Sequence, residues 1–155
     1  MKKNPPGLYV LFYTEIWELF GRFGITALLV LYLTNMFHMS DAKAFSIYSG
    51  FIALIYVMPI IGGYFSDRWL GLRHAIVLGA SLMALGDALM IIPREHWVFL
   101  GLAVVAVGSG FFLPSIVPLV GRLYKGDRQG RDAGFTWYYI GKNIGALLAP
   151  ISCGL

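Results

Sequence analysis

Five ionisable side chains lie inside long apolar stretches of the sequence. They are Glu15, Glu18, Arg22, Asp87 and Lys142. A charged side chain at the centre of a bilayer costs about 2.5–3.5 kcal/mol on insertion scales, so such residues usually face the interior of a helix bundle and mark ion or substrate pathways. These five residues are therefore the first candidates for chemistry in this chain.

Glu15, Glu18 and Arg22 are spaced i, i+3 and i+7, which places them on one face of a helix. A carboxylate in a medium of low dielectric constant is costly when charged, and a nearby cation offsets that cost. We therefore expect one or both glutamates to carry protons, with Arg22, Lys142 and Asp87 as charge partners. The alternative is a salt-bridge cluster that only fixes helix packing, and for Asp87 a packing role is as well supported as a functional one.

The apolar stretches that hold these residues predict an all-α membrane protein with about five transmembrane helices. Hydrophobic residues make up 58% of the 155 residues and charged residues 13%, whereas a soluble domain typically has about 25% charged residues. About 20 apolar residues suffice to cross a bilayer. The predicted helices cover residues 7–37, 44–65, 74–92, 97–124 and 134–155, and together we interpret residues 1–155 as an incomplete N-terminal transmembrane bundle.

The predicted helices bring four of the charges to a similar depth. Counting about 1.5 Å per residue from the cytoplasmic end of each helix places Glu15, Glu18, Asp87 and Lys142 about 10–18 Å into the membrane. Secondary transporters hold substrate and coupling ions near the bilayer midplane. The spacing therefore predicts that charges from three helices meet where a transporter would use them.

The distribution of basic residues predicts a cytoplasmic N-terminus, because cytoplasmic loops carry an excess of Lys and Arg. Two basic residues, Lys43 and Arg94, fall in the loops on the predicted outer side. Eight fall on the inner side: Lys2, Lys3, Arg68, Arg73, Arg122, Lys125, Arg128 and Arg131.

Several other classes of protein fit the sequence poorly. The basic residues sit in short loops, unlike the clustered basic face of a nucleic-acid-binding domain. The single cysteine, Cys153, cannot form an internal disulfide. No metal-binding motif, phosphate loop or nucleophile–base pair is visible, so an enzyme is the least expected reading. Trp97, Trp137 and Tyr138 are expected to anchor the helices at the membrane interfaces.

Four stretches resemble the proton-coupled oligopeptide transporter family (POT/PTR) of the major facilitator superfamily. Residues 62–76 are similar to the loop between helices 2 and 3 of the superfamily. Residues 15–24 look like the family's ExxERFxYYG motif, and residues 108–114 like its GxGxFKP motif. Residues 127–150 resemble its loop and fifth-helix signature. The matches occur in order along the whole chain.

The resemblance implies roles for individual residues. The glutamates of the first helix, Glu15 and Glu18, would take part in proton coupling. Asn143 would help to bind the amino end of a peptide, and Tyr56 would line the pocket. A cytoplasmic gating motif would comprise Gly62, Gly63, Asp67, Arg68, Gly71 and Arg73, in which paired glycines allow close helix contact and Asp67 can form a charge latch with the arginines.

The sequence departs from the family pattern at its basic positions. Leu19, Thr26 and Leu113 stand where the family has, or often has, a basic residue, whereas Arg22 and Lys142 are basic where the family usually is not. Our hypothesis is that the cations have been relocated to balance the same two glutamates. Coupling would then survive while peptide specificity changes.

Together these features predict a proton-coupled symporter of di- or tripeptides or similar small solutes, working by alternating access. The alternatives are a major facilitator symporter of a non-peptide solute and a non-transporting truncated membrane protein. We expect no cofactor or metal besides coupling protons, a multi-pass location in a membrane, the bacterial inner membrane being favoured, and a C-terminal bundle in the full-length chain. The 155 residues would then be a fragment of a longer reading frame or an inactive product.

Overall fold

The computed structural model describes residues 5–124 and 128–154, which form helices joined by short turns, with no strand among them. The all-α fold class is confirmed. The α-helices are α1 (Pro6–Phe37), α2 (Asp41–Phe65), α3 (Leu72–Met90), α4 (Glu95–Leu123) and α5 (Arg128–Gly154). A π-helix, η1 (Ser66–Leu70), follows α2 directly. Lys2, Lys3 and Lys125 lie outside the described residues.

The helices differ from the predicted ranges mainly at polar ends. α2 begins at Asp41 instead of residue 44, and α5 begins at Arg128 instead of residue 134. Hydropathy marks the lipid-facing part of a helix, and polar turns extend the helix beyond it. α3 ends at Met90 instead of residue 92, because Pro93 disfavours the α conformation in the residue before it.

Four helical segments are long and apolar enough to cross a membrane by length and composition. Within the described residues these are Pro6–Phe37, Asp41–Leu70, Leu72–Met90 and Glu95–Leu123. α5 is not among them, although its 27 residues would reach about 40 Å at 1.5 Å per residue. Lys142 and the polar first turns lower its apolar content, so the fifth span remains a prediction.

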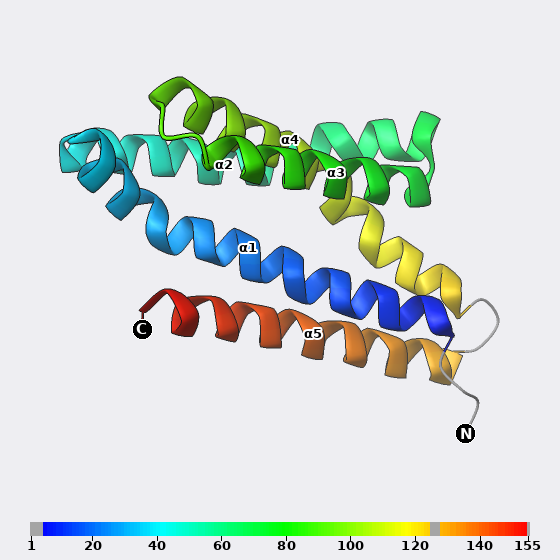
Figure 1. Cartoon of the computed structure of the whole chain (residues 1–155). Helices are drawn as coiled ribbons and strands as arrows, with labels where there is room; N and C mark the ends of the chain where they lie inside the picture. The colour runs from blue at the N-terminus through cyan, green and yellow to red at the C-terminus, as the bar shows by residue number, and fades with distance from the viewer. Residues whose placement is uncertain (1–4, 125–127, 155) are drawn as a thin grey trace. The chain divides into compact units, whose positions relative to one another are not determined.

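The chain forms two compact units. Unit 1 comprises Met1–Leu29 and Leu119–Leu155, and unit 2 comprises Val30–Pro118. In unit 1, α1 and α5 lie side by side and run in the same direction (Figure 1). The candidate proton site lies in this unit.

Glycines set the contact between α1 and α5. A Cβ atom added at Gly141 would lie 2.8 Å from the Phe12 ring, and one added at Gly145 would lie 2.6 Å from the Ile16 carbonyl oxygen. The members of each pair are 129 positions apart, so the two helices keep a single parallel register. Small residues allow such close approach between membrane helices, and the Gly141-xxx-Gly145 spacing places both glycines of α5 at this contact.

In unit 2, α3 and α4 pack against each other in opposite directions through matched glycines. A Cβ at Gly79 would come 2.7 Å from the Gly108 oxygen, and one at Gly86 would come 2.7 Å from the Gly101 oxygen. The two glycines of each helix are seven residues apart, which is two helical turns. This seam leaves no room for larger side chains.

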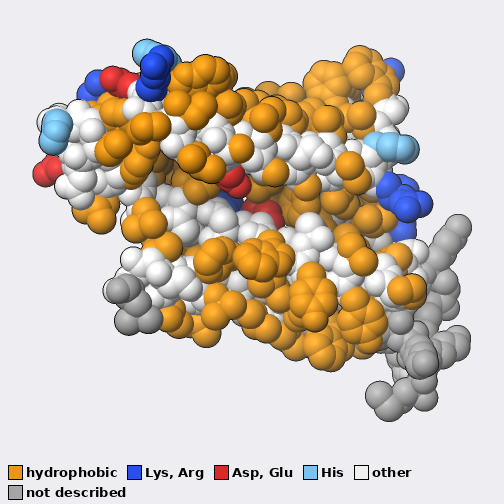
Figure 2. Space-filling model, viewed as in Figure 1, with side chains coloured by type: hydrophobic (Ala, Val, Ile, Leu, Met, Phe, Trp, Pro, Cys, Tyr) orange, Lys and Arg blue, Asp and Glu red, His pale blue; other side chains and the backbone are white. Residues whose placement is uncertain are grey.

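The outer surface is apolar over much of its extent. Hydrophobic side chains cover much of the face shown in Figure 2. Large side chains such as Ile60 and Ile91 are 74% and 80% exposed. Contiguous apolar patches of this kind mark contact with lipid or with further protein.

Candidate functional site

Four of the five predicted intramembrane charges lie in unit 1. Glu15, Glu18 and Arg22 come from α1, and Lys142 comes from α5. The i, i+3 and i+7 spacing on one helix and the parallel register of α5 bring these residues to the α1–α5 contact. The fifth, Asp87, belongs to α3 in unit 2, where its side chain is exposed.

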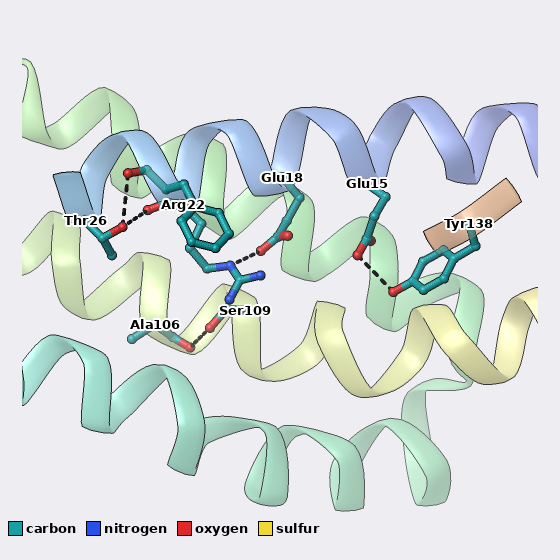
Figure 3. Close-up of polar contacts among 8 residues, drawn as sticks. Glu15, Glu18, Arg22, Thr26, Ala106, Ser109 and Tyr138 are labelled. Atoms are coloured by element: carbon teal, nitrogen blue, oxygen red, sulfur yellow. Dashed lines mark hydrogen bonds and ion pairs between the residues drawn. The ribbon is translucent and has the colours of Figure 1, made fainter. Parts of the chain in front are cut away.

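Glu18 is held by Arg22, one helical turn further along α1. The Arg22 Nε lies 3.0 Å from the Glu18 Oε1, and the two side chains are 17% and 3% exposed (Figure 3). The contact is an ion pair, and neither Glu18 oxygen has a hydrogen-bond partner among the described residues. The Arg22 guanidinium also lies 5.6 Å from the centroid of the Phe23 ring, within cation–π range. Glu18 and Arg22 therefore neutralise each other within α1.

Glu15 has a different partner. Its side chain is fully buried, and the Tyr138 hydroxyl on α5 donates a 2.9 Å hydrogen bond to its Oε1 (Figure 3). The second oxygen, Oε2, has no hydrogen-bond partner in the part of the chain that the structure describes. Glu15 is therefore held by a neutral donor at one oxygen and left open at the other.

The position of Tyr138 corrects the expectation that it anchors the membrane interface. Tyr138 is only 2% exposed, because it lies on the buried stripe of α5 with Gly134, Gly141 and Gly145. The i, i+4, i+7 and i+11 spacing of these four residues indicates that they share one face of the helix. The interface expectation missed this face because it rested on residue type alone. Trp137, the preceding residue, is 46% exposed and makes an edge-to-face contact with Phe12.

Lys142 is half-buried and lies within electrostatic range of both carboxylates. It makes no ion pair within 4.0 Å with any described acid. Leu19, one of the positions where a base was expected, is buried, and its Cβ lies 3.0 Å from the Cβ that a side chain at Gly145 would have. The two cations therefore differ, since Arg22 forms an ion pair and Lys142 acts at longer range.

The two predicted solute-binding residues are exposed within their own units. Tyr56 is 72% exposed on α2 in unit 2, and Asn143 is exposed on α5 in unit 1. Neither side chain makes a hydrogen bond with another residue in the described part of the chain. Both side chains are therefore available to a ligand or to another part of a larger protein.

The predicted gating motif lies at the junction of α2, η1 and α3. Gly62 packs on the Gly110 backbone of α4, and Gly63 would place a Cβ 3.3 Å from Pro114. Gly71 adopts φ 73° and ψ 152°, a conformation open mainly to glycine, and its N–H donates to the Ser66 carbonyl at 2.8 Å. The close contact expected of the paired glycines is thus present.

The charged half of that motif is not engaged. Asp67 makes no ion pair with Arg68, Arg73 or any other base among residues 5–124 and 128–154. The charge latch stays a prediction.

Comparisons with known proteins agree with this architecture. Residues 73–155 match the POT family (PTR2). The chain is 38% identical over 152 residues to dipeptide and tripeptide permease A of Serratia proteamaculans (strain 568), covering 97% of this chain and 30% of the permease. It is 36% identical to the protein of the same name from Yersinia pestis, with the same coverage.

Solved structures show the same likeness. A crystal structure of peptide transporter POT in complex with sulfate superposes with a TM-score of 0.91 at 36% identity, covering 97% of this chain and 32% of that one. A POT family transporter in complex with 5-aminolevulinic acid superposes with a TM-score of 0.89 at 38% identity, covering 95% and 31%. The chain thus spans about a third of the length of these relatives and is part of a multi-pass membrane protein. By its matched residues and its fold, this chain belongs to the POT family.

Proposed function

We propose that this chain is the N-terminal part of a proton-coupled symporter of di- or tripeptides or similar small solutes. Membership of the POT family and the names of the relatives support this proposal. In it, a C-terminal bundle beyond these residues completes the solute cavity, and alternating access exposes the cavity to each side of the membrane in turn. The symporter is multi-pass in the bacterial inner membrane with a cytoplasmic N-terminus, is not an enzyme, and needs no cofactor besides protons.

The single observation that carries the proton coupling is the pair of buried acids on α1. Glu15 and Glu18 are 0% and 7% exposed, yet only Glu18 has a cation within ion-pair distance. Intramembrane acids of this kind commonly form proton relays in transporters. A change in the distance of Lys142 would then favour loading or release of a proton at the acids.

The solute side of the proposal rests on the exposed residues. Tyr56 and Asn143 present unengaged polar groups, and Asn143 offers both a hydrogen-bond donor and an acceptor. We assign Asn143 to the amino end of a peptide and Tyr56 to the pocket wall. The glycine contacts at Gly62 and Gly63 would let α2 and α4 move as one body during gating.

A second candidate is a symporter of a non-peptide solute. The positions Leu19, Thr26 and Leu113 lack the basic side chains that the family pattern led us to expect. One solved relative is described in complex with 5-aminolevulinic acid. A solute whose charges are distributed differently from those of a peptide would suit this altered set of basic side chains.

The test uses the complete transporter that contains this chain, reconstituted into liposomes with an inward proton gradient. We expect a labelled dipeptide to accumulate, the accumulation to collapse with a protonophore, and Glu15→Gln or Glu18→Gln to lose most of it. Glu95→Gln is the matched control, because Glu95 is an exposed acid paired with Lys43 at 3.4 Å. Gradient-independent uptake would refute proton coupling, and accumulation of 5-aminolevulinic acid without peptides would favour the second candidate.

A further inference from the structure

We propose that Tyr138 is a positioning residue of the proton site, whose hydroxyl holds Glu15 and makes Glu15, not Glu18, the acid that loads and releases the proton. The inference rests on the proposed function and deepens it. It assigns proton transfer to Glu15 and a constant ion pair to Glu18, three positions further along the same helix face. It also makes α5 contribute to coupling through Tyr138.

The division follows from the partners of the two acids. Glu18 lies 3.0 Å from the Arg22 guanidinium, so protonating Glu18 would leave a half-buried arginine without its counter-ion. Removing one charge from a buried ion pair is strongly unfavourable. Among residues 5–124 and 128–154, Glu15 has only the neutral Tyr138 hydroxyl at hydrogen-bond distance. Its charge can therefore change without stranding a cation.

Charged and titratable groups from both helices of unit 1 act on Glu15. The charged and titratable groups that act on it are Glu18 and Arg22 from α1, and Tyr138 and Lys142 from α5. Tyr138 and Lys142 are four residues apart, so both project from neighbouring turns of α5. A movement of α5 along α1 would change the hydroxyl contact and the distance of the lysine together.

The hydrogen bond is compatible with both protonation states of Glu15. The Oε1 atom accepts from Tyr138, while Oε2 is buried without a partner among the described residues. A proton from water on one side of the membrane would form an O–H bond at Oε2, and Oε1 would remain an acceptor as the carbonyl oxygen of the acid. Release breaks that O–H bond and returns the proton to water on the other side. Tyr138 keeps its own proton throughout.

The fixed register of the two helices explains why Tyr138 can do this. Gly141 and Gly145 bring the α5 backbone against Phe12 and Ile16, so the ring of Tyr138, on the same buried stripe, projects into the space beside Glu15. A phenylalanine at this position would fill the same volume without holding the carboxyl. The hydroxyl is therefore the atom to test.

The experiment compares Tyr138→Phe with Tyr139→Phe in the complete transporter. Tyr139 is the neighbouring ring and is 55% exposed, so its variant controls for loss of a tyrosine hydroxyl. Proton-driven uptake is measured beside solute exchange without a proton gradient. Infrared difference spectra record the carbonyl band of the protonated acid. Loss of this band in Glu15→Gln assigns it to Glu15, and Glu18→Gln serves as the comparison.

We expect Tyr138→Phe to lower proton-driven uptake about two- to tenfold, the range that one neutral hydrogen bond provides, while exchange is unchanged. The carbonyl band should vanish in Glu15→Gln, persist in Glu18→Gln, and move to higher frequency in Tyr138→Phe but not in Tyr139→Phe. An unmoved band, or equal losses of exchange and proton-driven uptake, would overturn the role of Tyr138.

The assignment of the proton can be checked without the tyrosine variant. If the band is lost in Glu18→Gln and kept in Glu15→Gln, Glu18 is the carrier and the inference is wrong, even where Tyr138→Phe does not fold. If the native protein shows the Glu15 band but no proton-driven uptake, the proposed symport fails while the hydrogen-bond assignment stands. The two failures are thus distinguishable.

Discussion

Glu15 and Glu18 illustrate how two acids of the same type on one helix acquire different chemistry. Glu18 is paired by a residue of its own helix, at a distance fixed by the helical repeat. Glu15 is held by a residue that lies 123 positions away in the sequence. The first arrangement exists as soon as α1 forms, whereas the second requires α5 to dock.

Removing the cation of the first pair should destabilise the protein. Arg22→Gln leaves the Glu18 carboxylate, 3% exposed, without its counter-ion, and we expect the free energy of unfolding to fall by about 3 kcal/mol. Denaturant titration in detergent measures the change. The double variant Glu18→Gln/Arg22→Gln should recover much of the loss.

The control for that experiment is the exposed pair of Lys43 and Glu95, at 3.4 Å. Lys43→Gln should change the free energy of unfolding by less than about 1 kcal/mol, as is usual for exposed ion pairs. Equal effects of Arg22→Gln and Lys43→Gln would show that burial of the Glu18–Arg22 pair has no energetic consequence.

The hypothesis that relocated cations balance the two glutamates can be tested at Lys142. This residue makes no close ion pair, yet lies within electrostatic range of both carboxylates. We expect Lys142→Ala to impair proton-driven uptake, and Lys142→Arg to retain more of it because the charge is kept. If transport by Lys142→Ala is intact in a proton-uptake assay, the relocation hypothesis is refuted for this residue.

At the scale of helices, glycine decides which faces meet. The residue pairs 12/141 and 16/145 keep one register between α1 and α5, and Gly79 and Gly86 do the same between α3 and α4. Without a hydrophobic driving force between membrane helices, such close packing is a main source of association. The placement of the candidate proton site therefore depends on residues that carry no charge.

Filling one of these contacts should separate the helices. A Cβ at Gly145 would lie 2.6 Å from the Ile16 backbone oxygen, and we expect Gly145→Ala to lower the free energy of unfolding by about 1–3 kcal/mol, as overpacking does. Gly21→Ala on α1 is the matched control, since nothing lies within 4 Å of a Cβ there. Unfolding in detergent compares the two, and equal stabilities would argue against the α1–α5 seam.

At the scale of the whole molecule, the chain supplies about a third of its relatives' length. Its exposed apolar residues, such as Ile60 and Ile91, are suited to lipid or to the rest of a transporter. The orientation in the membrane rests on the excess of Lys and Arg on one side of the predicted spans.

That orientation can be measured by cysteine labelling in a Cys153→Ala background. We expect Ser40→Cys, between α1 and α2, to react with a membrane-impermeant maleimide in intact cells. Arg73→Cys, at the start of α3, should react only after the membrane is permeabilised. Both side chains are exposed, so access to the reagent is decided by the side of the membrane. The reverse pattern would place the N-terminus outside.

The sequence by itself determined the features that depend on composition and on local spacing. Apolar stretches predicted the all-α class, the motifs predicted the family, and the helical repeat placed Glu15, Glu18 and Arg22 on one face. These predictions succeed because the period of an α-helix is the same in every protein. They reached the site on α1 and named Lys142 of α5 as a charge partner, but they missed Tyr138.

Only the tertiary structure decided which residues from different helices meet. It placed Tyr138 against Glu15, kept Lys142 outside ion-pair distance, and assigned Asp87 to the other unit. Such contacts depend on which face of each helix carries side chains small enough for close approach. Glycines on separate segments of the chain together determine that face. The period of a single helix fixes which side chains share a face, but it cannot specify the face that a second helix will cover.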